Sequence, residues 1–277
     1  MNPFEQYKSL DLSLNPENRS LTVTLMFEED RPYMSLAMIL EIENLVKWLT
    51  TKVEINSVLF KSNNECFGNG LNLTDWEQKG EQKLFDIYRR FQRLVYGMFF
   101  LPQTIVIDYG NMARGLGAEF GLCADLRFCR NGARIEFSKL SEGLVPMSGG
   151  VGFLSTLIGK SRAKAWLLSP FAPTNASLLE SGYILETYAE GESPAQKYID
   201  AIANQSPMAR IQTKSSQLQA ILPELDRALE YEEAYASGCM AFGDWREFMN
   251  SKKDQRKPAF KNPREASREV KMAINEV

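Results

Sequence analysis

RGLGAEFGLCADLRF, residues 114–128, places one carboxylate, Glu119, among neighbours that are mostly small or apolar. The glycines of this stretch either allow close backbone packing or leave N–H groups open at a helix start, where they can bind an oxygen atom. Two interpretations of Glu119 follow. It is either a buried carboxylate paired with an Arg or Lys elsewhere in the chain, or a working acid or base. Composition alone favours the structural pair.

Hydrophobic patterns on both sides of this stretch alternate between the periods of strands and helices. Strand patterns occupy residues 21–27, 56–62, 103–110, 126–130 and 133–137. Helical spacing occupies residues 36–49 and 84–98, and a short buried helix is expected within 115–124. This alternation predicts an α/β fold with right-handed crossovers.

Beyond Gly150 the strand patterns fade and helical ones dominate. Helices are expected over 149–159, 161–169 and 175–183, and from about residue 194 to the end, with interruptions at Pro207, Pro223, Pro258 and Pro263. GFLSTLIGKS (152–161) suggests a phosphate loop, but that pattern needs glycine where Leu154 stands. A helix that ends at Gly159 explains the segment better.

Composition limits the classes of protein to consider. The 277 residues, 44% of them apolar and 24% charged, allow one large domain or one domain with a smaller appendage. A net charge of −3 argues against broad nucleic-acid binding, because there is no basic surplus to neutralise phosphates. The sequence has no run of 18 apolar residues, so no membrane span is expected. The polar start lacks the apolar centre of a signal peptide. We therefore expect a cytoplasmic protein.

The chain contains no histidine and four cysteines, at positions 66, 123, 129 and 239. Their spacing predicts neither a disulfide framework nor a zinc site, so we expect four reduced, partly buried thiols and no bound metal. The absence of histidine removes Ser-His and Cys-His nucleophile pairs. Any acid–base chemistry must use carboxylates, Lys, Tyr or Cys.

Four segments together resemble the enoyl-CoA hydratase/isomerase (crotonase) family. FGNGLNLTDW (67–76) is similar to the family's F-x-x-G-x-D-L loop, and RGLGAEFGLCADLRF to its glycine-rich segment with an acid and a D-x-R. ARIEFSKLSEGLVPMSGG (133–150) follows the A-x-F-x-x-P-E stretch and its Pro-x-x-Gly-Gly end, and DWREFMNSKKDQRKPAF (244–260) resembles the family's terminus.

The resemblance implies a crotonase-like spiral of repeated ββα units over residues 1–200. It implies a C-terminal helical region, 201–277, that mediates homotrimers or dimers of trimers. The implied substrate is an acyl-CoA thioester, with coenzyme A as part of the substrate and no other cofactor. The backbone N–H groups of Leu71 and Leu116 fall at the two oxyanion-hole positions, where each donor is worth roughly 3 kcal/mol of transition-state stabilisation. Glu119 falls at the first of two catalytic glutamates.

The chain departs from the family pattern at several positions. Lys139 stands where hydratases carry their second glutamate, which puts ordinary hydration in doubt. Asn72 replaces the loop's usual acid, and Thr74 stands where a CoA-binding lysine is common. Burial of Glu119 would favour its neutral form, whereas a nearby lysine would favour the carboxylate. Glu142, three residues beyond Lys139, is expected at the surface.

Three functions remain open. The preferred one is an enzyme that stabilises an enolate-like intermediate and uses Glu119 alone as acid and base, such as an enoyl-CoA isomerase. The second is a hydratase, hydrolase or decarboxylase in which Lys139 acts directly. The third is a non-catalytic crotonase-like oligomer that binds a thioester or a protein. The candidate substrate- and CoA-binding residues are Phe67, Gly70, Asn72, Gly115, Lys257 and Lys261. The two lysines belong to a basic run that a solvated turn explains equally well.

Overall fold

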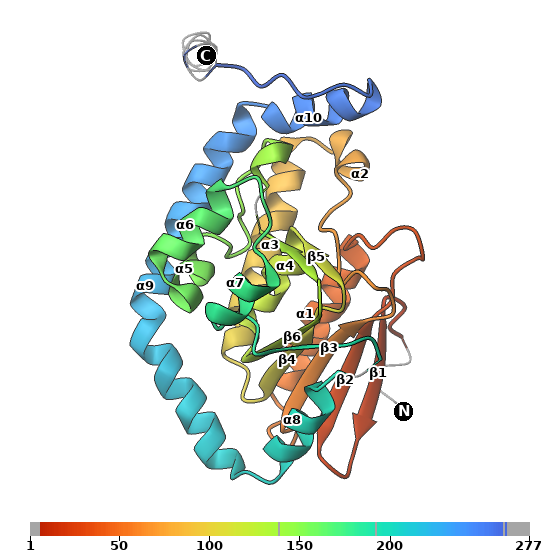
Figure 1. Cartoon of the computed structure of the whole chain (residues 1–277), viewed down its shortest axis with the longest axis vertical. Helices are drawn as coiled ribbons and strands as arrows, with labels where there is room; N and C mark the ends of the chain where they lie inside the picture. Colours follow the sequence, from red (N-terminus) through yellow and green to blue (C-terminus); the bar gives the residue numbers. More distant parts are fainter. Residues whose placement is uncertain (1–5, 138, 192, 263, 265–277) are drawn as a thin grey trace.

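Six strands form the main sheet, in the order β1-β2-β3-β4-β6-β8 (Figure 1). They are Leu10–Asn15, Ser20–Leu25, Ser57–Ser62, Thr104–Asp108, Leu126–Arg130 and Glu186–Tyr188. β1 pairs antiparallel with β2, and every later neighbour is parallel. The computed structural model describes residues 6–137, 139–191, 193–262 and 264.

Short strands that follow β4 and β6 in the sequence form a second, smaller sheet. Its strands β5 (Met112–Arg114) and β7 (Arg134–Glu136) are parallel, and Cys66 adds isolated bridges to Gly110 and Met112. Each turn therefore gives one strand to the main sheet and a short extended segment to the second sheet before the chain continues. This arrangement confirms the expected crotonase-like spiral of ββα units and the α/β class.

Helices cover the sheets and form the C-terminal part of the described chain (Figure 1). The helices are α1 Leu36–Leu49, α2 Leu73–Glu77, α3 Glu81–Phe99, α4 Leu116–Phe120, α5 Gly152–Ile158, α6 Lys160–Leu168, α7 Asn175–Glu180, α8 Ala195–Ala203, α9 Pro207–Ala241 and α10 Asp244–Lys253. Two short 3₁₀ turns, η1 Gly121–Cys123 and η2 Leu140–Glu142, follow α4 and β7.

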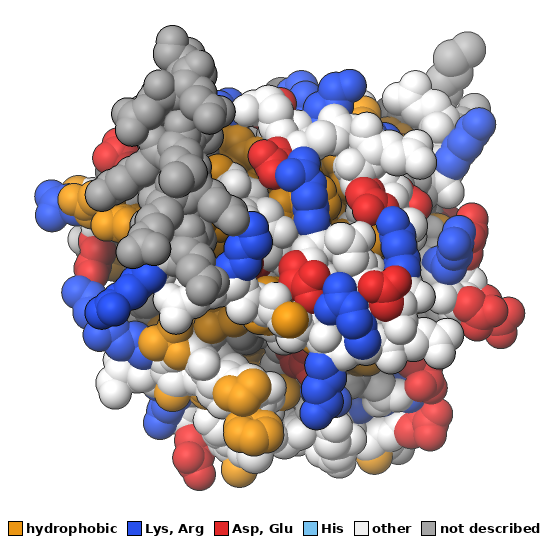
Figure 2. All heavy atoms as spheres, turned by 90° about the horizontal axis from the view of Figure 1, so that it is seen from above, with side chains coloured by type: hydrophobic (Ala, Val, Ile, Leu, Met, Phe, Trp, Pro, Cys, Tyr) orange, Lys and Arg blue, Asp and Glu red, His pale blue; other side chains and the backbone are white. Residues whose placement is uncertain are grey.

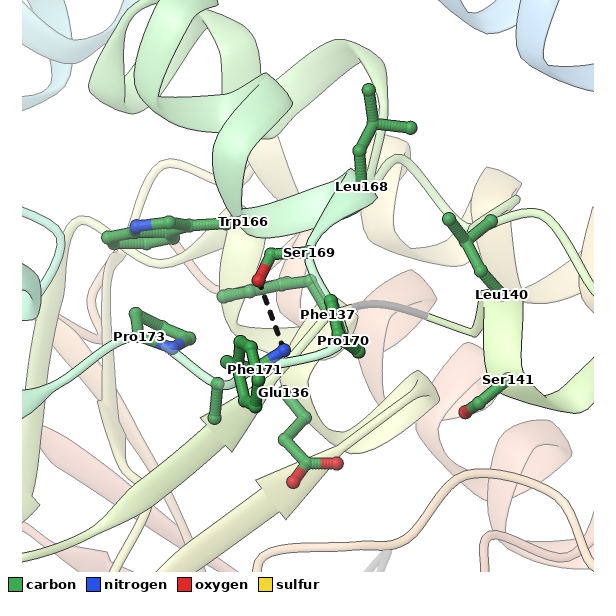
Figure 3. Close-up of a pocket in the computed structure, with 11 residues that line it drawn as sticks. Glu136, Phe137, Leu140, Ser141, Trp166, Leu168, Ser169, Pro170, Phe171 and Pro173 are labelled. Carbon is green, nitrogen blue, oxygen red and sulfur yellow. Dashed lines mark hydrogen bonds between the residues drawn. The ribbon is translucent and has the colours of Figure 1, made fainter.

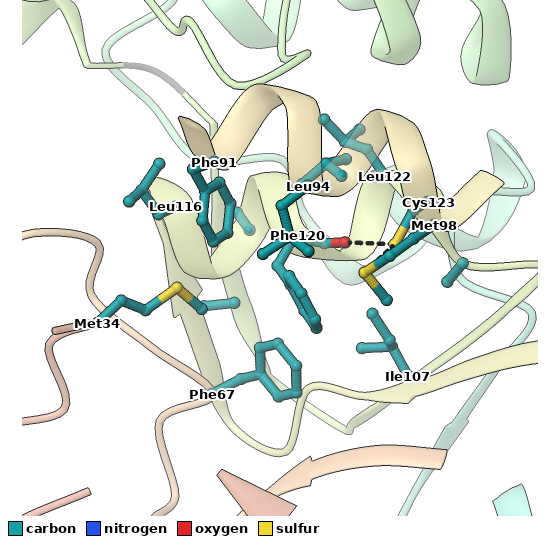
Figure 4. Close-up of a cluster of buried hydrophobic side chains, with 14 of the residues drawn as sticks. Met34, Phe67, Phe91, Leu94, Met98, Ile107, Leu116, Phe120, Leu122 and Cys123 are labelled. Carbon is teal, nitrogen blue, oxygen red and sulfur yellow. Dashed lines mark hydrogen bonds between the residues drawn. The ribbon is translucent and has the colours of Figure 1, made fainter. Parts of the chain in front are cut away.

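The core packs between α3, α4 and the main sheet. The apolar residues of α3 recur at helical spacing, so one face of the helix is buried. Phe120 of α4 lies with its ring centroid 5.9 Å from those of both Phe91 and Phe67, and 5.1 Å from that of Phe60 (Figure 4). The segment around Glu119 is thus anchored by an aromatic cluster directly beside it.

The Asp and Arg that follow α4 have structural roles. The Asp125 carboxylate accepts hydrogen bonds from the Ile105 amide and from Lys214 of α9, both at 2.7 Å. The buried Arg127 guanidinium donates to the carbonyls of Ala124 and Tyr183. These contacts join β4, β6 and α9, so this part of the glycine-rich segment fixes the position of α4 rather than contributing chemistry.

The predicted helices and strands up to residue 180 are confirmed, with shorter ends in several places, and Gly159 does separate α5 from α6. β1, β5, β8 and α2 were not predicted. Pro223 was expected to interrupt a helix, but this was wrong, because α9 continues through it. Pro223 is exposed, so water can bind the carbonyl that its missing N–H leaves unpaired. Pro263 lies outside the described residues.

α9 runs along one side of the molecule and α10 crosses one end of it, near α2 (Figure 1). Ser206 caps α9 by accepting a hydrogen bond from the Ala209 amide, and Pro207 occupies the first turn, where its missing N–H has no cost. Because α8 spans Ala195–Ala203, the proposed division at residue 200 falls within that helix, and it stays a prediction.

The four cysteines are unpaired thiols, and three of them are buried. Burial raises the pKa of both Cys123 and Cys129 to about 12, and it also raises the pKa of Cys66 and Cys239. At neutral pH these groups are protonated and poorly nucleophilic. Among the described residues, no helix has the length and apolar character needed to cross a membrane.

We expect Gly117→Ala to destabilise the protein by about 1–3 kcal/mol, because the new methyl carbon would lie 2.1 Å from the Gly68 carbonyl oxygen. Gly97→Ala, in α3, is the matched control. Its methyl group meets nothing within 4 Å, so the better helix propensity of alanine should stabilise the protein by about 0.5–1 kcal/mol. Urea unfolding of both variants measures the difference. Equal effects would contradict the close contact at Gly117.

Candidate active site

Two glycine turns meet at the point where the resemblance places an oxyanion hole. Gly70, after β3, and Gly115, before α4, both have positive φ, of 85° and 54°. A methyl carbon at Gly70 would lie 3.2 Å from the Leu116 nitrogen, and the Arg114 amide donates to the Gly68 carbonyl at 2.8 Å. Only glycine allows the two backbones to approach this closely in these conformations.

The amides of Leu71 and Leu116 follow directly after these two turns. Leu116 is the first residue of α4, so its N–H has no partner within the helix. Within the described part of the chain, neither amide donates to another protein atom. The structure therefore brings the two predicted donors into one neighbourhood, with Leu71 at the lining of a surface pocket and Leu116 fully buried behind it.

Glu119 is paired with Lys139. Its Oε2 lies 2.8 Å from Lys139 Nζ, and the two side chains are 0% and 3% exposed. Lys139 Nζ also lies 4.3 Å from the ring centroid of buried Tyr88, and a methyl carbon at Gly115 would lie 3.2 Å from Lys139 Cε. The partner that the structural interpretation of Glu119 required is thus the residue at the family's second acid position, and the pair lies against the Leu116 turn.

The loop from Ser148 to Gly152 contacts the other carboxylate oxygen. Ser148 N donates to Glu119 Oε1 at 3.3 Å, and a methyl carbon at Gly150 would lie 2.7 Å from the same oxygen. The glycine at 150 is therefore required by close approach to Glu119.

A second buried carboxylate, Glu232 of α9, binds this loop. It accepts hydrogen bonds from Gly149 N at 2.6 Å, Val151 N at 3.0 Å and Gly152 N at 3.3 Å, and from Gln92 Nε2 at 3.3 Å. Burial, and then the nearby Glu119, raise the pKa of Glu232 to about 7, although the amides lower it. No motif in the sequence identifies Glu232 as a site residue. The feature that could have done so is its position as an acid on the buried face of α9, in line with Leu225 and Met240.

A surface pocket of about 300 Å³ lies beside the two turns. Leu71 and Asn72 line it from one side, Arg114 and Glu142 from a second, and Lys252 of α10 from a third. Asn72 also caps α2 by accepting from the Thr74 amide, which holds the loop in place. The pocket opens next to the Leu71 amide and is the place in the described structure where a polar ligand can approach the turns.

Several predicted site residues lie elsewhere. Phe67 is fully buried in the core against Tyr109 and Phe120, not in this pocket. Lys257 and Lys261 are exposed and do not line it, whereas Lys252 of the same basic run does. Their roles in binding CoA stay predictions.

Glu142 was expected either to approach the site or, preferably, to be exposed at the surface, and it lies half-buried at the surface pocket. Its side chain is 18% exposed and lies 2.8 Å from Arg114 Nη2. Burial raises its pKa, and Arg114 and Lys139 lower it. The reason is that η2 turns the chain back toward β5, so Glu142 faces Arg114 instead of solvent.

A smaller pocket, of about 180 Å³, lies on the far side of η2 (Figure 3). Phe137, Leu140 and Trp166 line it, and Ser169 and Phe171 close one side. None of the predicted site residues lines it. At the α10 end, Lys and Arg side chains are interspersed with Asp and Glu, so the visible face carries no large basic patch (Figure 2). Among the described residues, no three or more Cys, Asp or Glu side chains group as metal ligands.

A family comparison agrees with the spiral fold. Residues 21–263 match the model of the enoyl-CoA hydratase/isomerase family. The chain belongs to this family. Members of the enoyl-CoA hydratase/isomerase family are enzymes, so the position of the two turns is the natural place to seek chemistry.

Individual relatives are distant. A 2,3-dehydroadipyl-CoA hydratase of Escherichia coli is 22% identical over 253 residues, which are 91% of this chain and 98% of that protein. An enoyl-CoA isomerase/hydratase of Mycosarcoma maydis is 24% identical, over 73% of this chain and 75% of the relative. The crystal structure of an enoyl-CoA hydratase from Mycobacterium avium subsp. paratuberculosis superposes with a TM-score of 0.80 at 23% identity, covering 92% and 99% of the two chains. This likeness shows the fold.

We expect Lys139→Met to destabilise the protein by about 3–5 kcal/mol at neutral pH, because it leaves the Glu119 carboxylate buried without its cation. The matched control is Lys160→Met. Lys160 pairs with Glu224 at the surface, with side chains 78% and 60% exposed, so its loss should change the free energy of unfolding by no more than about 0.5 kcal/mol. Chemical denaturation compares the two. A cost below about 1 kcal/mol for Lys139→Met would mean that Glu119 is not held as an ion.

The stability of the protein should also depend on Glu232. Because folding raises the pKa of Glu232 to about 7, the folded state holds this proton more tightly than the unfolded state. Stability from this group is therefore complete at low pH and is lost as pH rises through 7. Relative to Glu232→Gln, the wild type should lose about 3 kcal/mol between pH 5 and 8. Urea denaturation across this range measures it, and parallel pH profiles would contradict the assignment.

Proposed function

We propose that this chain acts on an acyl-CoA thioester, stabilises an enolate-like intermediate and moves a proton with Glu119, as in a double-bond isomerase. The observation that carries the proposal is the meeting of the two glycine turns. The Leu71 amide has no protein acceptor among the described residues and follows a turn at a surface pocket. The Leu116 amide, also without an acceptor there, lies against Gly70 at the buried start of the helix that carries Glu119.

The proposed step starts when the thioester carbonyl oxygen accepts hydrogen bonds from the two amides. A proton leaves the α-carbon for a Glu119 carboxylate oxygen, and the C–H electron pair forms the new C=C bond as the carbonyl π electrons move to oxygen. In an isomerase the substrate is a 3-enoyl thioester, so the intermediate is a dienolate. The oxygen electrons then restore the carbonyl, the enolate C=C pair moves to form the α,β double bond, and the former β,γ π pair takes the proton from neutral Glu119 at the γ-carbon. No external oxidant, reductant or nucleophile is needed.

Lys139 has a definite effect on this step. The Lys139 amino group lies 2.8 Å from the Glu119 carboxylate oxygen that would accept the proton. After transfer, Glu119 is neutral and Lys139 has lost its ionic partner. The pair therefore favours return of the proton to the substrate.

The burial of the pair favours a second candidate, a crotonase-like oligomer that binds a thioester without turning it over. Glu119 has no exposed surface, so the acyl group has to enter between the Leu116 turn and Lys139 before any proton moves. If the ion pair does not open, the chain can bind but not react. The direct use of Lys139 in hydration, hydrolysis or decarboxylation is a third function, motivated by its place beside Gly115.

A cytoplasmic location and assembly as a homotrimer or dimer of trimers also remain proposals. The exposed Met208, Tyr231 and Tyr235 on α9 support a contact between copies of the C-terminal region.

The test is deuterium exchange at the acyl α-carbon, with butyryl-CoA and a panel of 3-enoyl-CoA thioesters in heavy water. The wild type should catalyse exchange, and Glu119→Gln should slow it by about 10²- to 10⁴-fold, because Gln cannot accept the proton. Glu224→Gln, at an exposed pair far along α9, is the matched control and should leave the rate unchanged.

Each outcome separates the candidates. No exchange on any thioester by the wild type, or equal rates in Glu119→Gln, would refute the proposed reaction. CoA-thioester binding without turnover, indifferent to Glu119→Gln, would support the binding oligomer. Turnover that survives Glu119→Gln but is abolished in Lys139→Ala would support direct chemistry by Lys139.

A further inference from the structure

Glu232 brings a second buried carboxyl group to the site from a distant part of the chain. It is 2% exposed and lies on the side of α9 that faces α3 and α5. Its carboxylate accepts hydrogen bonds from four donors. Three are backbone amides of the 149–152 loop, and the fourth is the side chain of Gln92 in α3. Glutamate side chains are usually exposed, so a buried glutamate that accepts from four donors holds the structure around it in place.

The anchored loop is rich in glycine. Gly149, Gly150 and Gly152 supply no side chains, and glycine loses the most backbone freedom when it is ordered. Val151 stands at the N-cap of α5 without a side-chain cap. Glu232 performs the capping from another helix, because its carboxylate accepts from the Val151 and Gly152 amides.

The same loop contacts the proposed base. Neighbouring amides bind different carboxylates, since Ser148 N donates to Glu119 and Gly149 N donates to Glu232. Gly150 then passes so close to Glu119 Oε1 that a methyl group would lie 2.7 Å from it. A shift of the loop by even 1 Å would therefore change the position of the Glu119 carboxylate.

The electrostatic contacts agree with this geometry. Glu119 of α4 raises the pKa of Glu232, whereas the loop amides and Gln92 lower it. Lys139, in contact with Glu119, is the cation beside the two acids. The three groups thus form one charged cluster around the 148–152 loop.

We propose that Glu232 is a positioning residue for the reaction of Glu119: by binding the amides of Gly149, Val151 and Gly152, it holds the loop against the Glu119 carboxylate. This inference rests on the proposed function. It assigns to α9 a part in the chemistry, although no residue of α9 lines the pocket beside the two turns.

Loss of the Glu232 charge should affect rate more than binding. The Leu71 and Leu116 amides and the pocket beside them do not depend on Glu232, so thioester affinity should stay within about threefold of wild type. The carboxylate of Glu119 would be less well placed, and misplacement of a catalytic group by about 1 Å can lower a rate by roughly 10²-fold.

The experiment compares wild type, Glu232→Gln and Glu232→Ala with Glu233→Gln as control. Glu233 is the next residue and pairs with Arg89 near the surface, so its loss removes a charge from α9 without touching the loop. Hydrogen–deuterium exchange mass spectrometry measures protection of the segment around 148–152. α-Carbon exchange of butyryl-CoA gives the rate, and titration with CoA gives the affinity. Gln is nearly isosteric, which keeps a folded variant available if Ala unfolds the chain.

We expect Glu232→Gln to lose protection at 148–152 and to exchange the α-proton about 10- to 100-fold more slowly at nearly unchanged affinity. The control should match wild type in all three measurements. A folded Glu232→Gln with a fully protected loop, or with a loosened loop and a wild-type rate, would overturn the inference. If wild type itself exchanges no thioester, the proposed function fails and the positioning role fails with it. A fully protected loop in an active enzyme instead rejects the positioning role alone.

Discussion

The structure depends on the close approach of two backbones, where the Gly117 α-carbon lies against the Gly68 carbonyl and the Gly70 α-carbon against the Leu116 amide. This contact is possible only because none of these glycines has a side chain. It brings the end of one ββα turn against the start of α4 in the next. Once it is made, the Leu71 and Leu116 amides lie in one place and Glu119 is fixed one helical turn from the second. The spiral places successive turns of the chain side by side, and the glycines let two of them approach closely enough to bring the two amides together.

The charged groups behind this contact are unusual for a protein interior. Glu119, Lys139 and Glu232 are all 2% exposed or less. A buried ion pair is poor evidence for stability as such, because apolar residues of similar volume often serve equally well. Perturbed and desolvated charges cluster at functional sites more often than elsewhere. The location of this cluster, against the turn that carries the Leu116 amide, is consistent with the proposed function.

The sequence predicted the parts of the fold that have strong periodic patterns. α1 and α3 each bury one regular stripe, and β3, β4 and β6 are apolar runs within the sheet. It missed β1, because that edge strand is mostly exposed and carries few apolar residues, and β8, because it is three residues long and its pairing is set by β6. Pro223 misled because proline stops a helix only where the lost hydrogen bond cannot be replaced.

The site was predictable to a similar degree. Glu119, Leu71 and Leu116 could be named because local motifs carry them. A pairing of Glu119 with a basic residue was one of two interpretations, and only the fold shows that Lys139 is the partner, while the acid–base role of Glu119 stays a proposal. Glu232 could not be placed, because its contacts depend on how α9 docks. An acid on a buried helical stripe indicates that a partner exists without identifying it.

The charges in this site also suggest how the chain can tolerate a lysine at the second acid position. The charges of Lys139 and Glu119 alone would cancel. With Glu232 the buried cluster contains two carboxyl groups and one amine, so acids outnumber bases in it. The two carboxylates differ in what holds them. Glu119 is bound by one cation and one amide, whereas Glu232 is bound by three amides and a glutamine side chain. Glu119 is the carboxylate on the helix that starts at the Leu116 turn, so under the proposed function it is the one that exchanges a proton with the substrate. Glu232, held by four donors, then serves to keep that arrangement in place.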